Sequence, residues 1–190
     1  MEPLFVSALV VALAEIGDKT QLLAILLATR FKKPVPIILG ILAATIANHL
    51  LASTVGYYLS DFLKGPWFKV LVAISFIAMA AWTLVPDKEE DTKADPGRFG
   101  VFVTTTIAFF LVEMGDKTQL ATVALAARFH TIVLVAAGTT LGMMIADIPA
   151  VLLGEAATKF VPVKYLRIAA ALLFFALGVW ALAEALGWVR

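Results

Sequence analysis

The sequence contains no cysteine and only two histidines in 190 residues. Without cysteine the chain has no disulfide framework and no thiolate metal site, and its redox compartment cannot be inferred. No Ser/His, Cys/His or multi-histidine arrangement is present from which a hydrolase or a catalytic metal centre is usually built. We therefore expect no enzyme activity and no bound cofactor.

Charge is scarce as well. Only 15% of the residues are charged, and the formal net charge is +1. No basic patch suggests binding to nucleic acid. In contrast, 62% of the residues are hydrophobic and the mean hydropathy is +0.96, which is far too apolar for an ordinary soluble domain. The composition indicates an integral membrane protein.

Long apolar segments account for most of the chain. A membrane-spanning helix needs about 20 mostly apolar residues, and runs such as Ile168 to Leu182 are continuously apolar rather than alternating, which favours helices over spanning strands. We predict an all-α polytopic membrane protein with six transmembrane helices, at residues 3–29, 34–59, 66–85, 99–127, 131–158 and 162–188.

The two halves of the chain repeat each other. A shift of 98 residues places Glu15 on Glu113, Arg30 on Arg128 and Gly40 on Gly138. Because each copy contains an odd number of spans, the second copy enters the membrane from the opposite side. We predict two inverted three-helix repeats, residues 1–85 and 99–190, joined by an acidic linker at 86–98. Many secondary transporters have this architecture, with the substrate held where the repeats meet.

The distribution of Lys and Arg predicts the orientation. With both termini outside, the cytoplasmic connections contain nine Lys and Arg residues and the outer connections contain four, as the positive-inside rule requires. The linker is then cytoplasmic, and we interpret it as a solvated tether rather than a cation-collecting segment. No positively charged leader precedes the first span. The expected location is the bacterial inner membrane, with both termini periplasmic.

The most informative feature is a polar segment inside the first and fourth spans. Residues 15–21 read EIGDKTQ, and residues 113–119 read EMGDKTQ. A charged side chain at membrane depth costs roughly 2.5–3.5 kcal/mol on insertion scales, so such residues usually mark a binding site or a pathway. Both copies lie about midway along their spans. We therefore expect a polar site near the centre of the bilayer.

The local geometry of the motif allows two descriptions. On a continuous helix, Glu15, Asp18 and Gln21 lie on one face because they are three residues apart. Alternatively, Gly17 and Gly115, each in mid-span, open the helix and direct backbone carbonyls towards an ion. A helix break at the glycines is a hypothesis that a continuous helix would refute.

The chemistry of the motif favours a divalent cation. Its four carboxylates and two lysines sum to minus two, and its oxygen donors are hard ligands that suit Mg, Ca or Mn. Carboxylates left without a cation in a low dielectric favour the protonated form, so exchange of a metal ion against protons is the simplest mechanism. The predicted metal ligands are Glu15, Asp18, Gln21, Glu113, Asp116 and Gln119. Further helpers are Thr20, Thr118, Asn48, His49, Asp147, Lys19 and Lys117.

Structural alternatives exist for several of these residues. Glu15 with Lys19, and Glu113 with Lys117, are four apart on a helix and could form ion pairs that only hold helices together. The 98-residue shift places His49 on Asp147. Each could be a ligand, His49 favouring Mn over Ca, or a hydrogen-bonded polar residue between packed helices.

The duplicated Glu-x-Gly-Asp-Lys-Thr motif resembles the cation/proton exchanger family that includes bacterial manganese exporters of the MneA type and Mn/Ca transporters of Golgi and chloroplast membranes. The resemblance covers the whole chain. It implies that Glu15, Asp18, Glu113 and Asp116 bind the metal, assisted by Thr20, Gln21, Thr118 and Gln119. It also implies manganese as the ion and export as the direction.

The leading functional prediction is therefore a secondary transporter that exports Mn(II) from the cytoplasm by cation/proton antiport with alternating access. Its partners would be the divalent ion, protons and the lipid bilayer. A Ca(II)/proton antiporter or a broad divalent cation exchanger is the alternative. A membrane scaffold held together by buried ion pairs is the competing hypothesis from another class.

Overall fold

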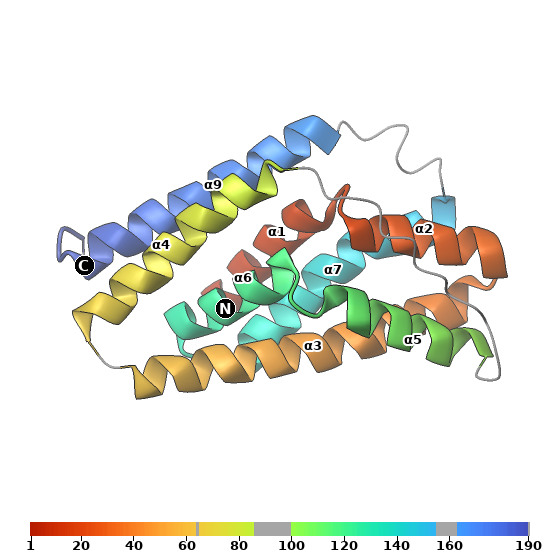
Figure 1. Cartoon of the computed structure of the whole chain (residues 1–190), viewed down its shortest axis with the longest axis horizontal. Coiled ribbons are helices and arrows are strands. Elements are labelled where there is room, and N and C mark those ends of the chain that lie inside the picture. The colour runs from red at the N-terminus through yellow and green to blue at the C-terminus, as the bar shows by residue number, and fades with distance from the viewer. Residues whose placement is uncertain (64, 86–99, 155–162, 190) are drawn as a thin grey trace.

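Helices make up the regular structure of the computed structural model, which describes residues 1–63, 65–85, 100–154 and 163–189 (Figure 1). The predicted linker at 86–98 lies outside the described residues. The helices are α1 (Glu2–Glu15), α2 (Lys19–Phe31), α3 (Pro34–Phe62), α4 (Pro66–Thr83), α5 (Gly100–Glu113), α6 (Lys117–Phe129), α7 (Val133–Leu153) and α9 (Val163–Ala185).

Four helices in the described ranges, α3, α4, α7 and α9, are long and apolar enough to cross a membrane, and α5 is a shorter apolar helix. They correspond to the spans predicted at 34–59, 66–85, 131–158 and 162–188, although residues 155–158 and 162 lie outside the described part. The all-helical membrane fold is thus confirmed.

The predicted spans 3–29 and 99–127 are not single helices. The first is divided into α1 and α2, and the second into α5 and α6. Gly17 and Gly115 both have φ of 80°, a left-handed conformation that a helix cannot contain and that glycine adopts without steric cost. Of the two descriptions that the sequence left open, the break at the glycines is confirmed and the continuous helix is not.

Glycines allow the broken helices to pack closely against the long ones. In α7, a Cβ at Gly138 would lie 2.4 Å from the Leu4 carbonyl oxygen of α1. In α3, a Cβ at Gly40 would lie 2.8 Å from Thr105 Cβ of α5. Gly40 and Gly138 are 98 residues apart, so α3 packs on α5 through the same position by which α7 packs on α1. The small glycine side chains thus permit close helix approach at equivalent positions of the two repeats.

Helices α4 and α9 run side by side along one flank of the molecule (Figure 1). The rings of Phe76 and Phe174 stack with centroids 6.5 Å apart, and Gly178 lets α9 approach Ile77 of α4. The pair rests on α1 and α6, where Val10 and Leu125 complete a common apolar cluster. Among the described residues, α4 and α9 have at most marginal contact with α5 and α2, respectively.

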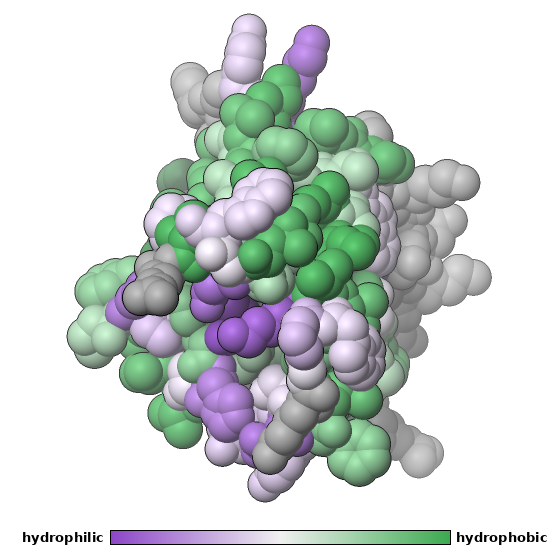
Figure 2. All heavy atoms as spheres, turned by 90° about the vertical axis from the view of Figure 1, so that its left-hand side faces the viewer, coloured by the Kyte–Doolittle hydropathy of each residue, from purple (hydrophilic) through white to green (hydrophobic). Residues whose placement is uncertain are grey.

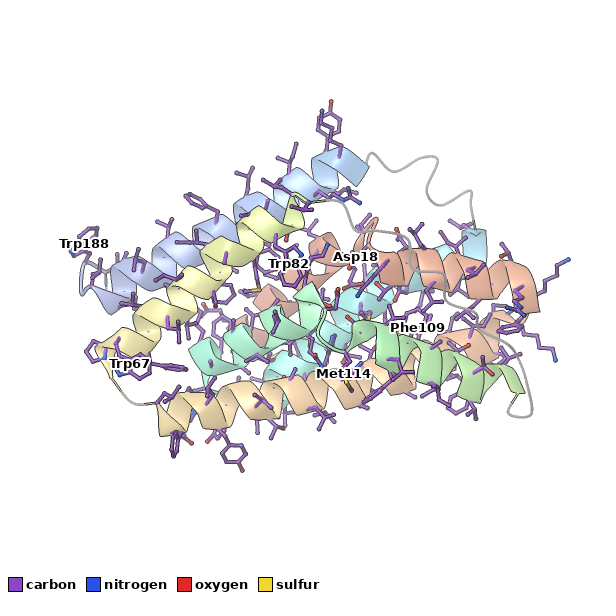
Figure 3. All side chains as sticks on the ribbon, viewed as in Figure 1. Asp18, Trp67, Trp82, Phe109, Met114 and Trp188 are labelled. Atoms are coloured by element: carbon purple, nitrogen blue, oxygen red, sulfur yellow. The ribbon has the colours of Figure 1, made fainter. Side chains whose placement is uncertain are left out.

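The outer surface is largely apolar, as expected for a protein surrounded by lipid. Large side chains such as Val55, Ile145 and Leu172 are more than half exposed. Figure 2 shows the end of the molecule where α3 meets α4, with hydrophilic side chains gathered in the middle of the face. In Figure 3, Asp18 lies near the middle of the long axis, far from that end. The motif is therefore internal, as predicted.

Candidate cation site

Two helix breaks face each other at the centre of the molecule. Helix α1 ends at Glu15, Gly17 turns the chain, and Asp18 is the N-cap of α2. The second motif has the same form, with Asp116 as the N-cap of α6. On a continuous helix the side chains of Glu15 and Asp18 would lie on one face. The break removes this helical arrangement of the two side chains. The backbone N–H of Asp18 still donates to the Glu15 carbonyl at 3.0 Å.

The glutamines of the motif hold the breaks in shape. Gly17 N–H donates to Gln21 Oε1 at 2.9 Å, and Gly115 N–H donates to Gln119 Oε1 at 2.6 Å. The side chain of Gln21 also donates to the Ala146 carbonyl of α7 at 3.2 Å. A break leaves backbone donors without helical partners, and in this conformation the glutamine side chains satisfy them.

The four motif carboxylates are buried. Glu15, Asp18, Glu113 and Asp116 are at most 3% exposed. Glu15, Glu113 and Asp116 each offer an oxygen, and the three oxygens lie within 4.8 Å of one another. Oxygens on opposite sides of a bound Mg or Ca ion lie about 4–5 Å apart. The trio therefore has the chemistry and spacing of a divalent cation site formed by both motifs.

Threonine hydroxyls orient the two glutamates. Thr20 donates to Glu15 Oε2, and Thr118 donates to Glu113 Oε1 at 2.6 Å. The other oxygens, Glu15 Oε1 and Glu113 Oε2, are buried and accept no hydrogen bond from the described residues. A buried ionised oxygen without a donor is costly, so each glutamate has one oxygen suited to a cation or a proton.

The lysines connect the two motifs. Lys117 Nζ lies 3.2 Å from Asp18 Oδ1, and Lys19 Nζ lies 3.1 Å from Asp116 Oδ1. Each lysine therefore pairs with the aspartate of the other motif. The sequence left local pairs of Glu15 with Lys19 and of Glu113 with Lys117 open as an alternative. The structure pairs each lysine with an aspartate across the two motifs, where it offsets the charge of that aspartate.

Three further predicted helpers lie in α3 and α7. Asn48 donates to the Phe110 carbonyl at 3.1 Å, which supports packing between helices. His49 and Asp147 are both fully buried, and neither the imidazole nitrogens nor the carboxylate oxygens have a hydrogen-bond partner among the described residues. Asp147 also interacts electrostatically with Glu15 and Glu113. It therefore flanks the trio.

The sequence did not indicate Arg167. This residue of α9 donates to the Gly17 carbonyl at 3.0 Å, although the two residues are 150 positions apart. In the sequence it is one of several basic residues near a predicted span end, and nothing distinguishes it from the others. Only the position of α9 against α1 brings it to the break.

Comparison with known proteins gives the family. The model of a family described as "Divalent cation/proton antiporter GDT1" matches residues 3–91 and 101–188, which is nearly the whole chain. The chain belongs to the GDT1 family. It is therefore a multi-pass membrane protein that transports divalent cations, and it is not an enzyme, as the motif predicted.

Individual relatives agree with this assignment. A protein of Vibrio cholerae named "Putative manganese exporter" is 46% identical over 175 residues, which cover 92% of this chain and 87% of that protein. A GDT1-like protein of Synechocystis is 26% identical over 90% of this chain and 92% of its own length. A GDT1-like protein 3 of Oryza sativa is 27% identical over 81% of this chain and 64% of its own length. No solved structure matches the chain.

Proposed function

We propose that this GDT1-family chain exports Mn(II) from the bacterial cytoplasm across the inner membrane in exchange for protons. The observation that carries the proposal is the buried trio of Glu15, Glu113 and Asp116, whose oxygens lie within 4.8 Å of one another. The name of the Vibrio cholerae relative supports manganese, and the description of the family supports the proton as counter-ion.

The proposed binding site uses both motifs. Glu15, Glu113 and Asp116 bind the ion directly, and Asp18 joins them when its pairing with Lys117 loosens. The glutamines Gln21 and Gln119 keep the breaks open in this conformation and are available as amide ligands in another. Thr20 and Thr118 hold the glutamates at the angle that presents their second oxygen.

Charge balance supports exchange against protons. The pairs Asp18–Lys117 and Asp116–Lys19 are each neutral when ionised. The remaining motif charge lies on Glu15 and Glu113, and either a divalent cation or protons on these glutamates can offset it. Because the two compete for the same oxygens, protonation releases the ion, and loss of the protons restores the site.

The proposed architecture is a pair of inverted repeats, residues 1–85 and 99–190, joined by a cytoplasmic linker at 86–98. Its supports are the equivalent breaks at Gly17 and Gly115, the equivalent packing glycines Gly40 and Gly138, and the two separate segments that match the family model. The excess of Lys and Arg on the linker side supports periplasmic termini.

The test is ion movement in proteoliposomes under an imposed pH gradient. We expect Mn(II) to move only when the gradient is present, and we expect Glu15→Gln and Asp116→Asn to abolish this movement. Glu184→Gln is the matched control, because the Glu184 side chain is 47% exposed and lies 3.5 Å from Arg128, outside the motifs, so its loss should leave the rate unchanged. Well-folded wild-type protein that moves no Mn(II) would refute the proposal.

Calcium is the second candidate ion, since oxygen ligands alone discriminate weakly between Mn and Ca. The buried imidazole of His49, whose ring nitrogens have no partner among the described residues, favours manganese if it reaches the ion. Replacing His49 with Asn should then lower the ratio of Mn(II) to Ca(II) transport, while Asp147→Asn should reduce both. An unchanged ratio in His49→Asn would show that His49 is a packing residue.

A further inference from the structure

Arg167 forms a contact that links the peripheral helix α9 to the first helix break. Its guanidinium donates to the Gly17 carbonyl at 3.0 Å in a partly buried environment. An arginine at membrane depth is costly unless its charge is neutralised or hydrogen-bonded. Arg167 is therefore held at the break by the backbone carbonyl that the left-handed turn at Gly17 exposes.

The second motif has no equivalent contact. The 98-residue shift relates Arg167 to Lys69 of α4, and Gly17 to Gly115. Lys69 is exposed, and the described residues include no hydrogen bond from it to Gly115. The motif surfaces differ accordingly: Ile16 and Gly17 are half-buried, whereas Gly115 is exposed and Met114 is 53% exposed.

The two ion pairs between the motifs also differ in exposure, although each joins a lysine of one motif to the aspartate of the other. In the pair at the first-motif aspartate, the side chains of Lys117 and Asp18 are 5% and 1% exposed. In the pair at the second-motif aspartate, those of Lys19 and Asp116 are 19% and 3% exposed. Helix α9 packs against α1 at the first break, whereas the described residues of the equivalent helices α4 and α5 have at most marginal contact. The hydrogen bond of Arg167 and the lower exposure of Ile16 and Gly17 therefore make the first break the more closed one.

We propose that Arg167 is a latch that keeps the first-motif side of the cation site closed in this conformation. Its hydrogen bond ties α9 to the break between α1 and α2, and its positive charge opposes the passage of a cation there. An ion leaves past the first motif only after this bond breaks and α9 moves away from Gly17. The inference rests on the proposed transport function, because a latch requires two access states.

The test uses the absence of cysteine from the chain. Single cysteines are introduced as Ile16→Cys or Met114→Cys, and the reaction rate of each with a charged, water-soluble thiol reagent is measured in nanodiscs. With Arg167 present, we expect Met114→Cys to react faster. Adding Arg167→Ala should raise the rate of Ile16→Cys about tenfold, the effect of losing one hydrogen bond to a charged group, and lower that of Met114→Cys.

Lys164→Ala is the matched control, because it removes the same charge from an exposed position one turn away on α9 and should change neither rate. Arg167→Lys keeps the charge but loses the planar donor pair, so an intermediate rate is expected, and this variant decides the question if Arg167→Ala does not fold. Unchanged rates in the folded Arg167 variant would overturn the latch.

The readout also separates this inference from the proposed function. Thiol rates that shift as expected in a protein that moves no Mn(II) would support the latch and refute manganese export. Normal Mn(II) transport with unshifted thiol rates would support manganese export and refute the latch.

Discussion

The two motif copies differ at one position, Ile16 against Met114, yet their surroundings are unequal. The first is covered by Arg167 from α9, and the second is open at Gly115. Since the local sequences are nearly identical, the difference must come from the helices packed around them. Helix α9 packs against α1 of the first copy, whereas the equivalent helices α4 and α5 have at most marginal contact within the described ranges.

This comparison suggests how the chain could change state. In an inverted repeat, exchanging the conformations of the two halves converts one access state into the other. We propose that the peripheral helices α4 and α9 shift between the two states while the broken helices keep the pairing of each lysine with the aspartate of the other motif. Such a shift around a fixed site would provide alternating access.

The largest predicted difference between the copies concerns the two lysines. Lys117→Met removes the partner of Asp18 in the more buried pair, and loss of one partner from a buried pair costs about 3–5 kcal/mol. Lys19→Met affects the pair whose lysine is 19% exposed but whose aspartate is only 3% exposed, so we expect a smaller loss of about 3 kcal/mol, at the lower end of that range. Unfolding in detergent, followed by circular dichroism, measures both.

The control for the lysines is Lys164→Met, which removes a charge from an exposed position and should leave the unfolding free energy unchanged. Equal losses for Lys19 and Lys117 would contradict the asymmetry between the two sides.

The glutamates, in contrast, should behave alike. Glu15→Gln and Glu113→Gln each keep the side-chain shape and an oxygen for the threonine hydroxyl, but remove one negative charge from the trio. We expect each to weaken Mn(II) binding by about 10–100-fold, a range typical of changes close to a metal. Isothermal titration calorimetry on the purified protein measures this, with Glu184→Gln as control.

Similar losses in the two glutamate variants would support one shared site. A loss confined to one of them would instead indicate that the ion belongs to a single motif.

Much of the site was predictable from local chemistry. The cost of charge in a membrane singled out the segments that contain Glu15 and Asp116, which the structure buries together, and the conformational freedom of glycine located the break at Gly17. The role of Gln21 was partly predictable, because a helix break leaves a backbone N–H that needs an acceptor. These features depend on residues within a few positions of one another.

The rest depends on how distant segments meet. The pairing of Lys117 with Asp18, and the contact of Arg167 with Gly17, join residues 99 and 150 positions apart. The relation between Glu15 and Asp18 that a continuous helix would give does not hold, because helical spacing rules apply only within one helix and the chain breaks between these residues. These contacts depend on tertiary packing, and no local sequence pattern predicts them.

The packing glycines provide a smaller comparison. Gly138→Ala would place a Cβ 2.4 Å from a backbone carbonyl oxygen, whereas Gly40→Ala would place one 2.8 Å from the Thr105 side chain and 2.9 Å from a carbonyl oxygen. Overpacking costs about 1–3 kcal/mol. We expect Gly138→Ala to be the more destabilising because the backbone of α1 moves less easily than a side chain. Melting temperatures in detergent would show this, and the reverse order would mean that α7 tilts to relieve the contact.

The smallest effect is expected at the helix ends that follow the motifs. Lys32 and His130 are equivalent C-cap residues with φ of 53° and 50°, a conformation that costs a non-glycine residue about 1 kcal/mol. Lys32→Gly should therefore stabilise the protein by about 0.5–1 kcal/mol. His130→Gly should have almost no net effect, because it also removes the 3.0 Å contact with Asp61 and the ring contact with Tyr57 at 4.3 Å. Lys33→Gly, at φ of −128°, is the control that loses the same charge without relieving the backbone. If His130→Gly stabilises the protein as much as Lys32→Gly, the contacts of His130 contribute nothing to the free energy of unfolding. The C-terminal ends of α2 and α6 are then energetically equivalent.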